Sequence, residues 1–424
     1  MPRQLTFLHA ADLHLGAPFR GLRAISPAWA DRLLRAIPEA YDRVIDIAIK
    51  RKVDFVVIAG DIFDDARASY ADYLHFFRGL ERLDEAGIPS YMCTGNHDPF
   101  ATWQQDFLSL PPSATMFSAD APDFALYERN GEPLCVLGGR GYPNSVWAGD
   151  QSIAAGITRA AANEALGPRA AAAPFGVGVL HTGLDLDNIK APASRRELLA
   201  AGFDYWALGH IHRRYVDDES NPRMIFPGDI QGRDIKETGR RGVTMVTLTQ
   251  GEPNKAEFVP TSSVAWEQIT LDVSDCVSVP EINKKLMSAQ FTANGPTQCE
   301  EMVTRITLTG ATPLHDLLAH PSVIEDMRAA ANESYAEFFV DAIINKTTRP
   351  IDRAALRAEG LFPAVFLNAA DALRDDRESE VAYLQQEFFN RNVPLPSDPL
   401  PDPVQLAREA EDLVLDLLIQ GDAQ

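Results

Sequence analysis

Apolar residues in the first half of the chain form short continuous runs, separated by longer segments with helical periodicity. The continuous runs predict strands that are buried on both faces, at 5–11, 55–59, 88–93, 176–180 and 205–208. Apolar residues at helical spacing predict helices over 28–48, with Pro38 as a candidate break, and over 70–85, where Gly87 follows the last turn. Strands that alternate with helices are typical of an α/β fold.

Weaker patterns fill the rest of the chain. Short strands and turns are predicted over 110–150, an alanine-rich helix and linker over 153–174, and strands at 224–226 and 243–248. A small α/β unit follows, with strands at 266–273 and 303–309 around a helix at 279–290. The last part is predicted to be helical, at 352–359, 363–374, 379–389 and 403–419.

The length of 424 residues is large for one core, so two or three domains are expected. The changes of pattern place a main domain at 1–260, a small α/β domain at 265–347 and a helical region at 350–424. Within the helical region, the proline-rich segment 393–403 is expected to be an extended, stiff linker.

The composition is that of a soluble globular protein, with 46% hydrophobic and 23% charged residues. The start of the chain has no secretory h-region, and no apolar stretch approaches the length that crosses a membrane. The four cysteines form no CxxC pair and are expected to be reduced thiols, with Cys93 in a core strand. Together these features predict a cytoplasmic protein without a membrane partner.

The formal net charge of −21 disfavours nonspecific binding of nucleic acid through a broad basic surface. It is compatible with a protein that collects divalent cations or docks on a basic partner. This charge is in tension with the chemistry of the polar motifs.

Polar clusters follow five of the predicted strands. They are Asp12 with His14, Asp61, Asn96-His97-Asp98, His181, and His210 with His212. In open α/β sheets, ligands bind beyond the carboxyl ends of the strands. The number of oxygen and nitrogen donors exceeds what one tetrahedral zinc needs and fits two metal ions. Two cations about 3.5–4 Å apart need a bridging anion, and Asp61 is the natural bridge.

Each cluster also has a purely structural interpretation. Asp61 alone would more often be a helix N-cap, and His181 alone a core histidine. Asn96-His97-Asp98 could form an Asx turn, and His210 and His212 could be one buried and one solvated residue. Their joint occurrence at successive strand ends favours ligation.

The series D-x-H, G-D, G-N-H-D, H and G-H-x-H resembles the calcineurin-like metallophosphoesterases. Within them, residues 9–16, 228–233 and 237–239 are similar to the YhaO-type, SbcD-like DNA repair exonucleases. The resemblance covers about residues 5–250 and extends more loosely to 265–345, where that family has a capping domain. It implies a β-sandwich flanked by helices (αββα) for the catalytic domain, a small α/β capping domain and a helical C-terminal tail.

The resemblance also implies the roles of the polar residues. The first metal ion would be held by Asp12, His14, Asp61 and His212, and the second by Asp61, Asn96, His181 and His210. The family typically uses Mn²⁺, which suits mixed carboxylate, amide and imidazole donors. His97 would bind no metal and would face the substrate phosphate, with Asp98 orienting it through a hydrogen bond.

Several further residues have open interpretations. Asp64 stands where some nuclease relatives carry a second catalytic histidine, so its role is undecided. Arg233 is either a phosphate contact or an ordinary surface arginine. The basic residues between 190 and 241 form either a DNA-facing surface or a solvated face with mixed charge. His9 is expected to pack in its strand and His75 to lie on a helix surface, while His315 and His320 are expected to be structural.

The resemblance implies DNA as the substrate and a coiled-coil ATPase of the SbcC or YhaN type as the partner of the C-terminal region. The alternative for the terminal helix is packing on its own domain. The chain has no Gly-x-x-x-x-Gly-Lys-Ser/Thr motif, so an ATP-driven step would come from the partner. A homodimer is a further candidate assembly.

The sequence therefore predicts a two-metal, Mn²⁺-dependent phosphodiesterase that acts on DNA as a repair exonuclease or endonuclease. One alternative is an enzyme of the same fold that acts on small phosphoesters, although the long extension after the core favours a macromolecular substrate. The other is a non-catalytic scaffold for the ATPase, against which the complete set of ligands argues.

Overall fold

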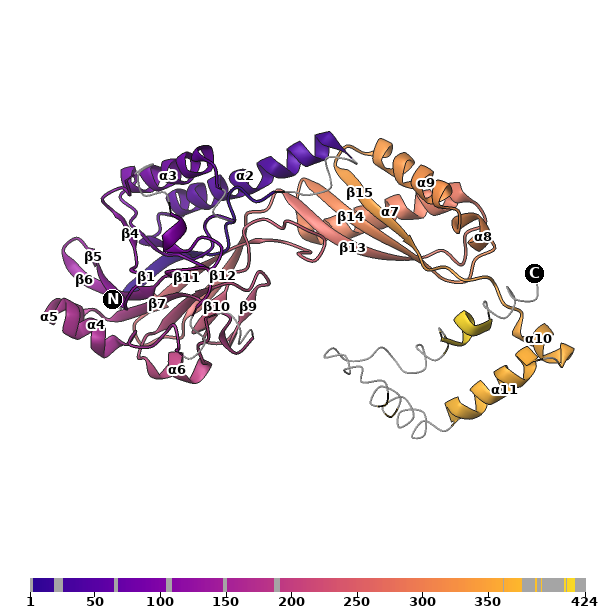
Figure 1. The fold of residues 1–424 in the computed structure, drawn as a ribbon. Helices are drawn as coiled ribbons and strands as arrows, with labels where there is room; N and C mark the ends of the chain where they lie inside the picture. The colour runs from indigo at the N-terminus through magenta and orange to yellow at the C-terminus, as the bar shows by residue number, and fades with distance from the viewer. Residues whose placement is uncertain are drawn as a thin grey trace. The chain divides into compact units, whose positions relative to one another are not determined.

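The computed structural model describes residues 3–18, 26–64, 68–103, 109–147, 151–186, 191–360 and 362–375, with 386, 390, 408 and 410–415. The chain divides into two compact units (Figure 1). The first comprises Met1–Glu267, Ala293–Val303 and Glu337–Phe339, and the second comprises Gln268–Thr292, Thr304–Ala336 and Val340–Gln424. The predicted helix at 379–389, most of the one at 403–419, and the linker 393–403 lie outside the described residues.

The first unit contains a six-stranded sheet with the order β12-β11-β1-β2-β3-β4. Its strands are β1 (Gln4–Ala10), β2 (Phe55–Ala59), β3 (Ser90–Cys93), β4 (Ala114–Met116), β11 (Gly242–Thr249) and β12 (Lys255–Pro260). Strands β1 to β4 are mutually parallel, whereas β11 pairs antiparallel with β1 and β12 antiparallel with β11. All five residues of β2 are buried, as its continuous apolar run predicts.

A second six-stranded sheet has the order β5-β6-β7-β8-β10-β9. Its strands are β5 (Asp123–Arg129), β6 (Glu132–Arg140), β7 (Phe175–His181), β8 (Tyr205–Gly209), β9 (Tyr215–Val216) and β10 (Met224–Phe226). Strands β6, β7, β8 and β10 are parallel, and the hairpin partner β5 and the short β9 are antiparallel edges. Both sheets therefore present a block of parallel strands with a shared carboxyl end.

The two sheets pack face to face through an apolar layer. Phe7 of β1 stacks on Phe55 of β2 with ring centroids 4.9 Å apart, and meets Tyr205 of β8 edge-on at 5.4 Å. Val177 and Cys135 of the second sheet lie in the same buried cluster. Alternate residues of each strand supply this layer, because successive side chains of a strand point to opposite faces.

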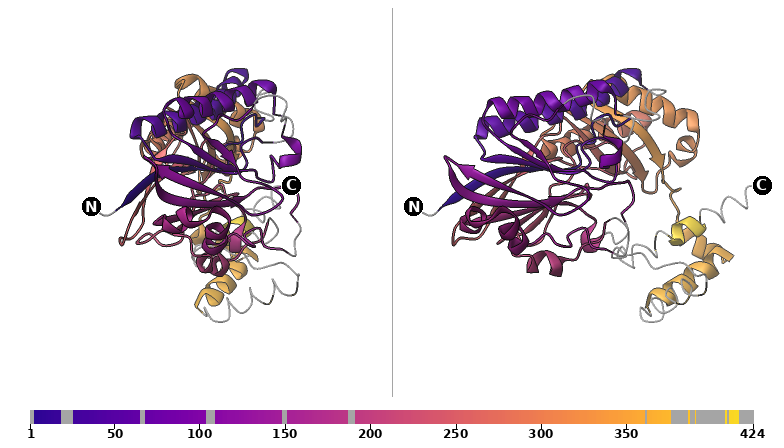
Figure 2. Two further views of the ribbon diagram at one scale, coloured as in Figure 1. Left: turned by 90° about the vertical axis from the view of Figure 1, so that its left-hand side faces the viewer. Right: turned by 60° about the vertical axis from the view of Figure 1, so that its left-hand side comes forward.

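Helices cover the outer face of each sheet (Figures 1 and 2). Helices α2 (Pro27–Arg51) and α3 (Tyr70–Glu85) pack on the first sheet through one continuous apolar cluster. Helices α4 (Arg159–Leu166), α5 (Pro168–Ala172) and α6 (Arg195–Ala200) pack on the second. Short 3-10 turns lie at Phe100–Thr102 and Leu184–Leu186. The predicted αββα sandwich is thereby confirmed.

Two predictions about helices are corrected. Helix α2 runs through Pro38 without a break. The bond that this proline cannot make is the one to the carbonyl of Leu34, a residue that is 44% exposed and so lies on the solvent side of the helix. The alanine-rich segment forms two helices instead of one, since Gly167 between α4 and α5 has φ of 78°.

The second unit contains most of a three-stranded sheet, β13 (Val264–Asp272), β14 (Glu301–Thr309) and β15 (Phe338–Asn345). Helices α7 (Val279–Thr297), α8 (His315–Leu318) and α9 (Pro321–Ser334) close its core. Helix α7 is longer than predicted. Helices α10 (Arg353–Glu359) and α11 (Phe362–Asp375) follow, in agreement with the predicted C-terminal helices. Among the described residues, no helix combines the length and apolarity needed to cross a bilayer.

Candidate metal centre

The polar residues singled out in the sequence lie at the carboxyl ends of the parallel strands. Asp12 and His14 follow β1, and Asp61 follows β2. The other sheet supplies His181 at the end of β7 and the pair after β8. Non-glycine residues with positive φ gather here: Asp12 at 52°, His14 at 48°, Asp61 at 48° and His210 at 107°. Such strained backbone is typical of functional sites, because surrounding structure must hold it in place.

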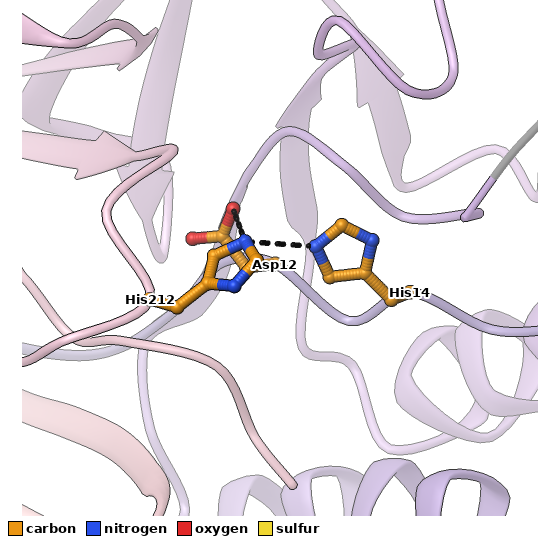
Figure 3. Close-up of side chains that lie close together, drawn as sticks. All are labelled: Asp12, His14 and His212. Atoms are coloured by element: carbon orange, nitrogen blue, oxygen red, sulfur yellow. Dashed lines mark hydrogen bonds and ion pairs between the residues drawn. The ribbon is translucent and has the colours of Figure 1, made fainter. Parts of the chain in front are cut away.

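Asp12, His14 and His212 form one cluster across the two sheets (Figure 3). Nε2 of His14 lies 3.1 Å from Nε2 of His212, which is 3.8 Å from Oδ1 of Asp12. Asp61 Oδ2 lies 3.9 Å from the same His14 nitrogen. Asp12 and His14 are buried, so water does not surround these donor atoms.

The ring of His212 has a defined tautomer. Its Nδ1 lies 2.7 Å from Oε1 of Glu237, and a carboxylate can only accept, so Nδ1 carries the proton. In the neutral ring, Nε2 then presents a lone pair toward His14 and Asp12. This is the arrangement of metal-binding histidines, whose second nitrogen donates to a carboxylate or carbonyl.

The ring of His181 is held in the same way as that of His212, in a second cluster with Asp12 and Asp61. Its Nδ1 donates to the carbonyl of Ala59 at 3.0 Å, which leaves the Nε2 lone pair 3.2 Å from both Asp61 Oδ2 and Asn96 Oδ1. Nδ1 of His210 approaches the same Asn96 oxygen at 3.1 Å. In the part of the chain that the structure describes, Asp61 Oδ2 is a buried atom without a hydrogen-bond donor. A divalent cation bound between these acceptors would satisfy them, as would a proton on His181 Nε2.

The protonation of the histidines in these clusters depends on the nearby carboxylates. Burial alone would lower the pKa of His181 and of His212, but Asp61 raises the pKa of His181 and Glu237 that of His212, each to about 9. Burial and the charge of Arg233 instead lower the pKa of His14 to about 4. Without a metal ion, protons on two histidines neutralise the carboxylates. Divalent cations would replace these protons, and the carboxylate, imidazole and amide donors suit a divalent metal ion.

His97 is exposed, and its ring is held by one nitrogen. Nδ1 lies 2.7 Å from the carbonyl oxygen of Asp64, and the backbone N–H donates to Asp61 Oδ1 at 2.9 Å. Nε2 of His97 is therefore the nitrogen available to a substrate.

Asp98 differs from its predicted role as the residue that orients the His97 ring. Its two oxygens accept from the backbone N–H groups of Gly95 at 2.7 Å and Ile62 at 3.0 Å. Burial and the nearby Asp61 charge raise the pKa of this carboxyl above its usual range. Asp98 therefore joins the loops after β2 and β3, which carry Asp61 and Asn96.

Near the centre, Glu237 was not predicted as a site residue, and the role of Asp64 was left undecided. Glu237 contacts His212, and Asp64 Oδ1 lies 3.1 Å from Nδ1 of His14. Arg233 lies between these two carboxylates and is 20% exposed in its side chain. The only sequence signal for Glu237 was its place in the 237–239 segment of the resemblance.

Other predictions for single residues can be compared with the structure. His9 is fully buried, and its Nδ1 lies 2.9 Å from the hydroxyl of Tyr205, so it packs in its strand as predicted. His75 pairs with Asp42 at 3.3 Å on the helical layer. All four cysteines are free and buried, and Cys93 lies in β3 as predicted.

Comparison with known proteins gives the same picture. Residues 5–214 match the calcineurin-like phosphoesterase family, and residues 266–348 match the middle domain of metallophosphoesterase YhaO. Metallophosphoesterase YhaO of Bacillus subtilis is 32% identical over 343 residues, which cover 80% of this chain and 79% of that protein. The DNA double-strand break repair protein Mre11 of Thermoplasma acidophilum is 24% identical, covering 68% of this chain and 73% of its own. That of Aeropyrum pernix is 26% identical, covering 64% of each chain.

The sandwich and its cluster of carboxylates and histidines define a metal-dependent hydrolase of phosphoesters. The chain belongs to the calcineurin-like metallophosphoesterases and, within them, to the family of metallophosphoesterase YhaO.

Proposed function

We propose that this enzyme is a Mn²⁺-dependent phosphodiesterase that cleaves DNA. One observation supports the proposal of two metal ions. The buried Asp61 Oδ2 lies close to the lone pairs of histidines from both sheets. The proposal of DNA as the substrate is supported by the similarity to proteins named for DNA double-strand break repair.

The proposed ligand sets are those that the family resemblance implies, and each overlaps in part with one of the two clusters. Asp12, His14, Asp61 and His212 would hold one cation, and Asp61, Asn96, His181 and His210 the other. When bound, the two cations would supply Lewis acidity to the phosphodiester and to the attacking water.

His97 acts on the leaving group in this proposal. Its Nδ1 is held by the Asp64 carbonyl, so a protonated ring can donate from Nε2 to the deoxyribose oxygen as the P–O bond breaks. Asp98 accepts hydrogen bonds from the backbone of Gly95 and of Ile62. In this way it fixes the relative positions of the neighbouring residues Asn96 and Asp61. Asp98 is thus a positioning residue rather than a proton donor to the substrate.

The positively charged surface that DNA could contact is smaller than the number of basic residues between 190 and 241 suggested. Arg241 is buried against Asp229 at 2.8 Å, and Arg223 donates to the carbonyl of Phe203. Among the described residues of this run, the basic side chains that remain exposed are Arg196, Arg213, Lys236 and Arg240. Arg213 directly follows His212, so these four are the proposed phosphate contacts outside the metal centre.

A coiled-coil ATPase of the SbcC or YhaN type is the proposed partner of the C-terminal region. Helix α11 exposes Phe362 at 66% and Val365 at 61%, which leaves apolar area for a docking partner. Homodimer formation belongs to the same proposal. Co-purification with the candidate ATPase, compared between the full chain and a Phe362→Ser/Val365→Ser variant, tests the docking surface.

The test of activity uses purified protein loaded with Mn²⁺ and three substrates: linear duplex DNA, single-stranded DNA and an aryl phosphodiester. We expect cleavage of DNA that EDTA abolishes and that the Asp61→Asn variant lacks. Hydrolysis of the aryl ester without cleavage of DNA would favour the small-phosphoester alternative. Bound Mn²⁺ without hydrolysis of any substrate would favour the scaffold alternative.

A further inference from the structure

Two carboxylates stand behind the histidines of the first proposed metal site. Glu237 accepts from Nδ1 of His212 at 2.7 Å, and Asp64 Oδ1 lies 3.1 Å from Nδ1 of His14. The metal-facing nitrogens of these two rings are only 3.1 Å apart. The carboxylate of Glu237 fixes the rotation of the His212 ring through this bond, and Asp64 limits the rotation of the His14 ring by its close approach.

One guanidinium joins the two carboxylates. Nη1 of Arg233 donates to Asp64 Oδ1 at 2.6 Å, and Nη2 lies 3.4 Å from Glu237 Oε1. The backbone N–H of Arg233 donates to the other oxygen of Glu237 at 2.6 Å. The planar fork of arginine suits this bridge, because it can hold two acceptors in one plane at a fixed spacing.

The electrostatics of this group depend on the arginine. The guanidinium contacts both carboxylates, whose side chains are 20% exposed in Asp64 and 12% exposed in Glu237. Without the guanidinium, two half-buried carboxylates would face each other across the histidines without a fixed cation.

A direct contact between Arg233 and the substrate fits these bonds poorly. Nη1 is directed at Asp64, Nη2 lies 3.4 Å from Glu237 Oε1 and 3.2 Å from Nδ1 of His212, and Nε is buried. A phosphate would have to displace Asp64 or Glu237 to reach the guanidinium. A second arginine, Arg241, donates to the carbonyl of His212, so the backbone of that loop is held separately from its ring.

We propose that Asp64, Arg233 and Glu237 form an arginine clamp that positions the rings of His14 and His212, so that Arg233 sets metal affinity at the first site. This inference rests on the proposed two-metal centre. It assigns Asp64 a role that differs from that of a histidine facing the substrate.

The test measures Mn²⁺ binding in the absence of substrate, by electron paramagnetic resonance of free and bound Mn²⁺. We expect the Arg233→Gln variant to weaken one of two sites by about 10–100-fold and to leave the other unchanged. The control is Arg129→Gln. Arg129, in β5, also donates to a carboxylate, that of Asp54, and its replacement should leave both metal sites unchanged. Glu237→Gln, which keeps an acceptor for His212 but loses the charge, should weaken the same site.

Kinetics separate the clamp from a substrate contact. The clamp predicts that excess Mn²⁺ restores kcat of Arg233→Gln while KM for DNA stays unchanged. Wild-type Mn²⁺ binding with a raised KM would overturn the inference and make Arg233 a phosphate contact. If Arg233→Gln does not fold, as judged by its thermal unfolding, Glu237→Gln decides by the same criteria. A wild-type protein that binds fewer than two Mn²⁺ ions contradicts the proposed function itself, whereas two ions with normal binding by both variants contradict only the clamp.

Discussion

At the scale of single residues, the three best-defined histidines of the centre each commit one ring nitrogen to the protein. His181 uses the Ala59 carbonyl, His212 uses Glu237, and His97 uses the Asp64 carbonyl. Each partner is an acceptor, so in the neutral ring each Nε2 carries the lone pair. That nitrogen belongs to a buried ring in His181 and to an exposed ring in His97, which is why we propose different roles for the two residues, metal ligand and proton donor.

The first prediction concerns His97. The variant His97→Ala should lose about 10²–10⁴-fold in kcat, because it removes the proposed general acid for the leaving oxygen. Bound Mn²⁺, measured by atomic emission after gel filtration, should remain at the wild-type level. Loss of metal from this variant would show that His97 is a ligand. The exchange His75→Ala, on the helical layer, is the matched control.

At the scale of elements, the centre depends on loops that approach each other closely. A Cβ at Gly209 would lie 1.9 Å from the carbonyl oxygen of Ala59, and one at Gly95 would lie 2.1 Å from Asp61 Oδ1. These glycines allow the ends of β2, β3 and β8 to meet. Any side chain there must displace the loop that carries Asp61.

The second prediction follows from this contact. The Gly95→Ala variant should lose about 1–3 kcal/mol of stability through overpacking, and should lose Mn²⁺ affinity in addition. Thermal unfolding with and without Mn²⁺ measures both effects. Gly295→Ala is the control, because its Cβ would meet no atom within 4 Å and a helix interior favours alanine. Equal behaviour of the two variants would contradict the role of Gly95.

The order of elements was predictable from the sequence, because strand and helix periodicities are local properties. The positions of Asp12, Asp61 and His181 at strand ends were equally accessible, since a strand's end is visible in its apolar pattern. The hydrogen bonds of the site could not be predicted from the sequence. Glu237 meets His212 through a loop geometry that no periodicity encodes, and Asp98 holds Ile62 and not the His97 ring. Pro38 was misjudged because its cost depends on whether water reaches the carbonyl one turn earlier.

At the scale of the whole molecule, the net charge of −21 opposes binding of DNA except where cations are fixed. The third prediction is that the metal-free protein binds duplex DNA weakly. Its log K should fall with log salt with a slope no steeper than about −4, since four exposed basic residues are available near the centre. Fluorescence anisotropy over a salt series measures this slope. A much steeper slope would reveal an extended basic surface elsewhere.

The fourth prediction concerns pH. In the metal-free protein, the pKa of His181 and of His212 is raised to about 9, so their stabilising charge is fully present below pH 6.5 and is lost as the pH rises through 9. The raised pKa of Asp98 acts in the same direction. The unfolding temperature in EDTA should therefore fall between pH 6.5 and 9. Saturating Mn²⁺ should remove most of this fall, because bound histidines no longer titrate; an equal fall with and without Mn²⁺ would contradict the assignment of these ligands.

The position of β1 between β2 and β11 has a consequence for synthesis of the chain. Strand β1 pairs with β2 soon after both have left the ribosome, but its other edge is covered only by Gly242–Thr249. Until residues 242–249 have been synthesised, the nascent chain therefore carries an unpaired edge of β1 beside the proposed metal ligands. Truncated products that end before β11 should therefore aggregate.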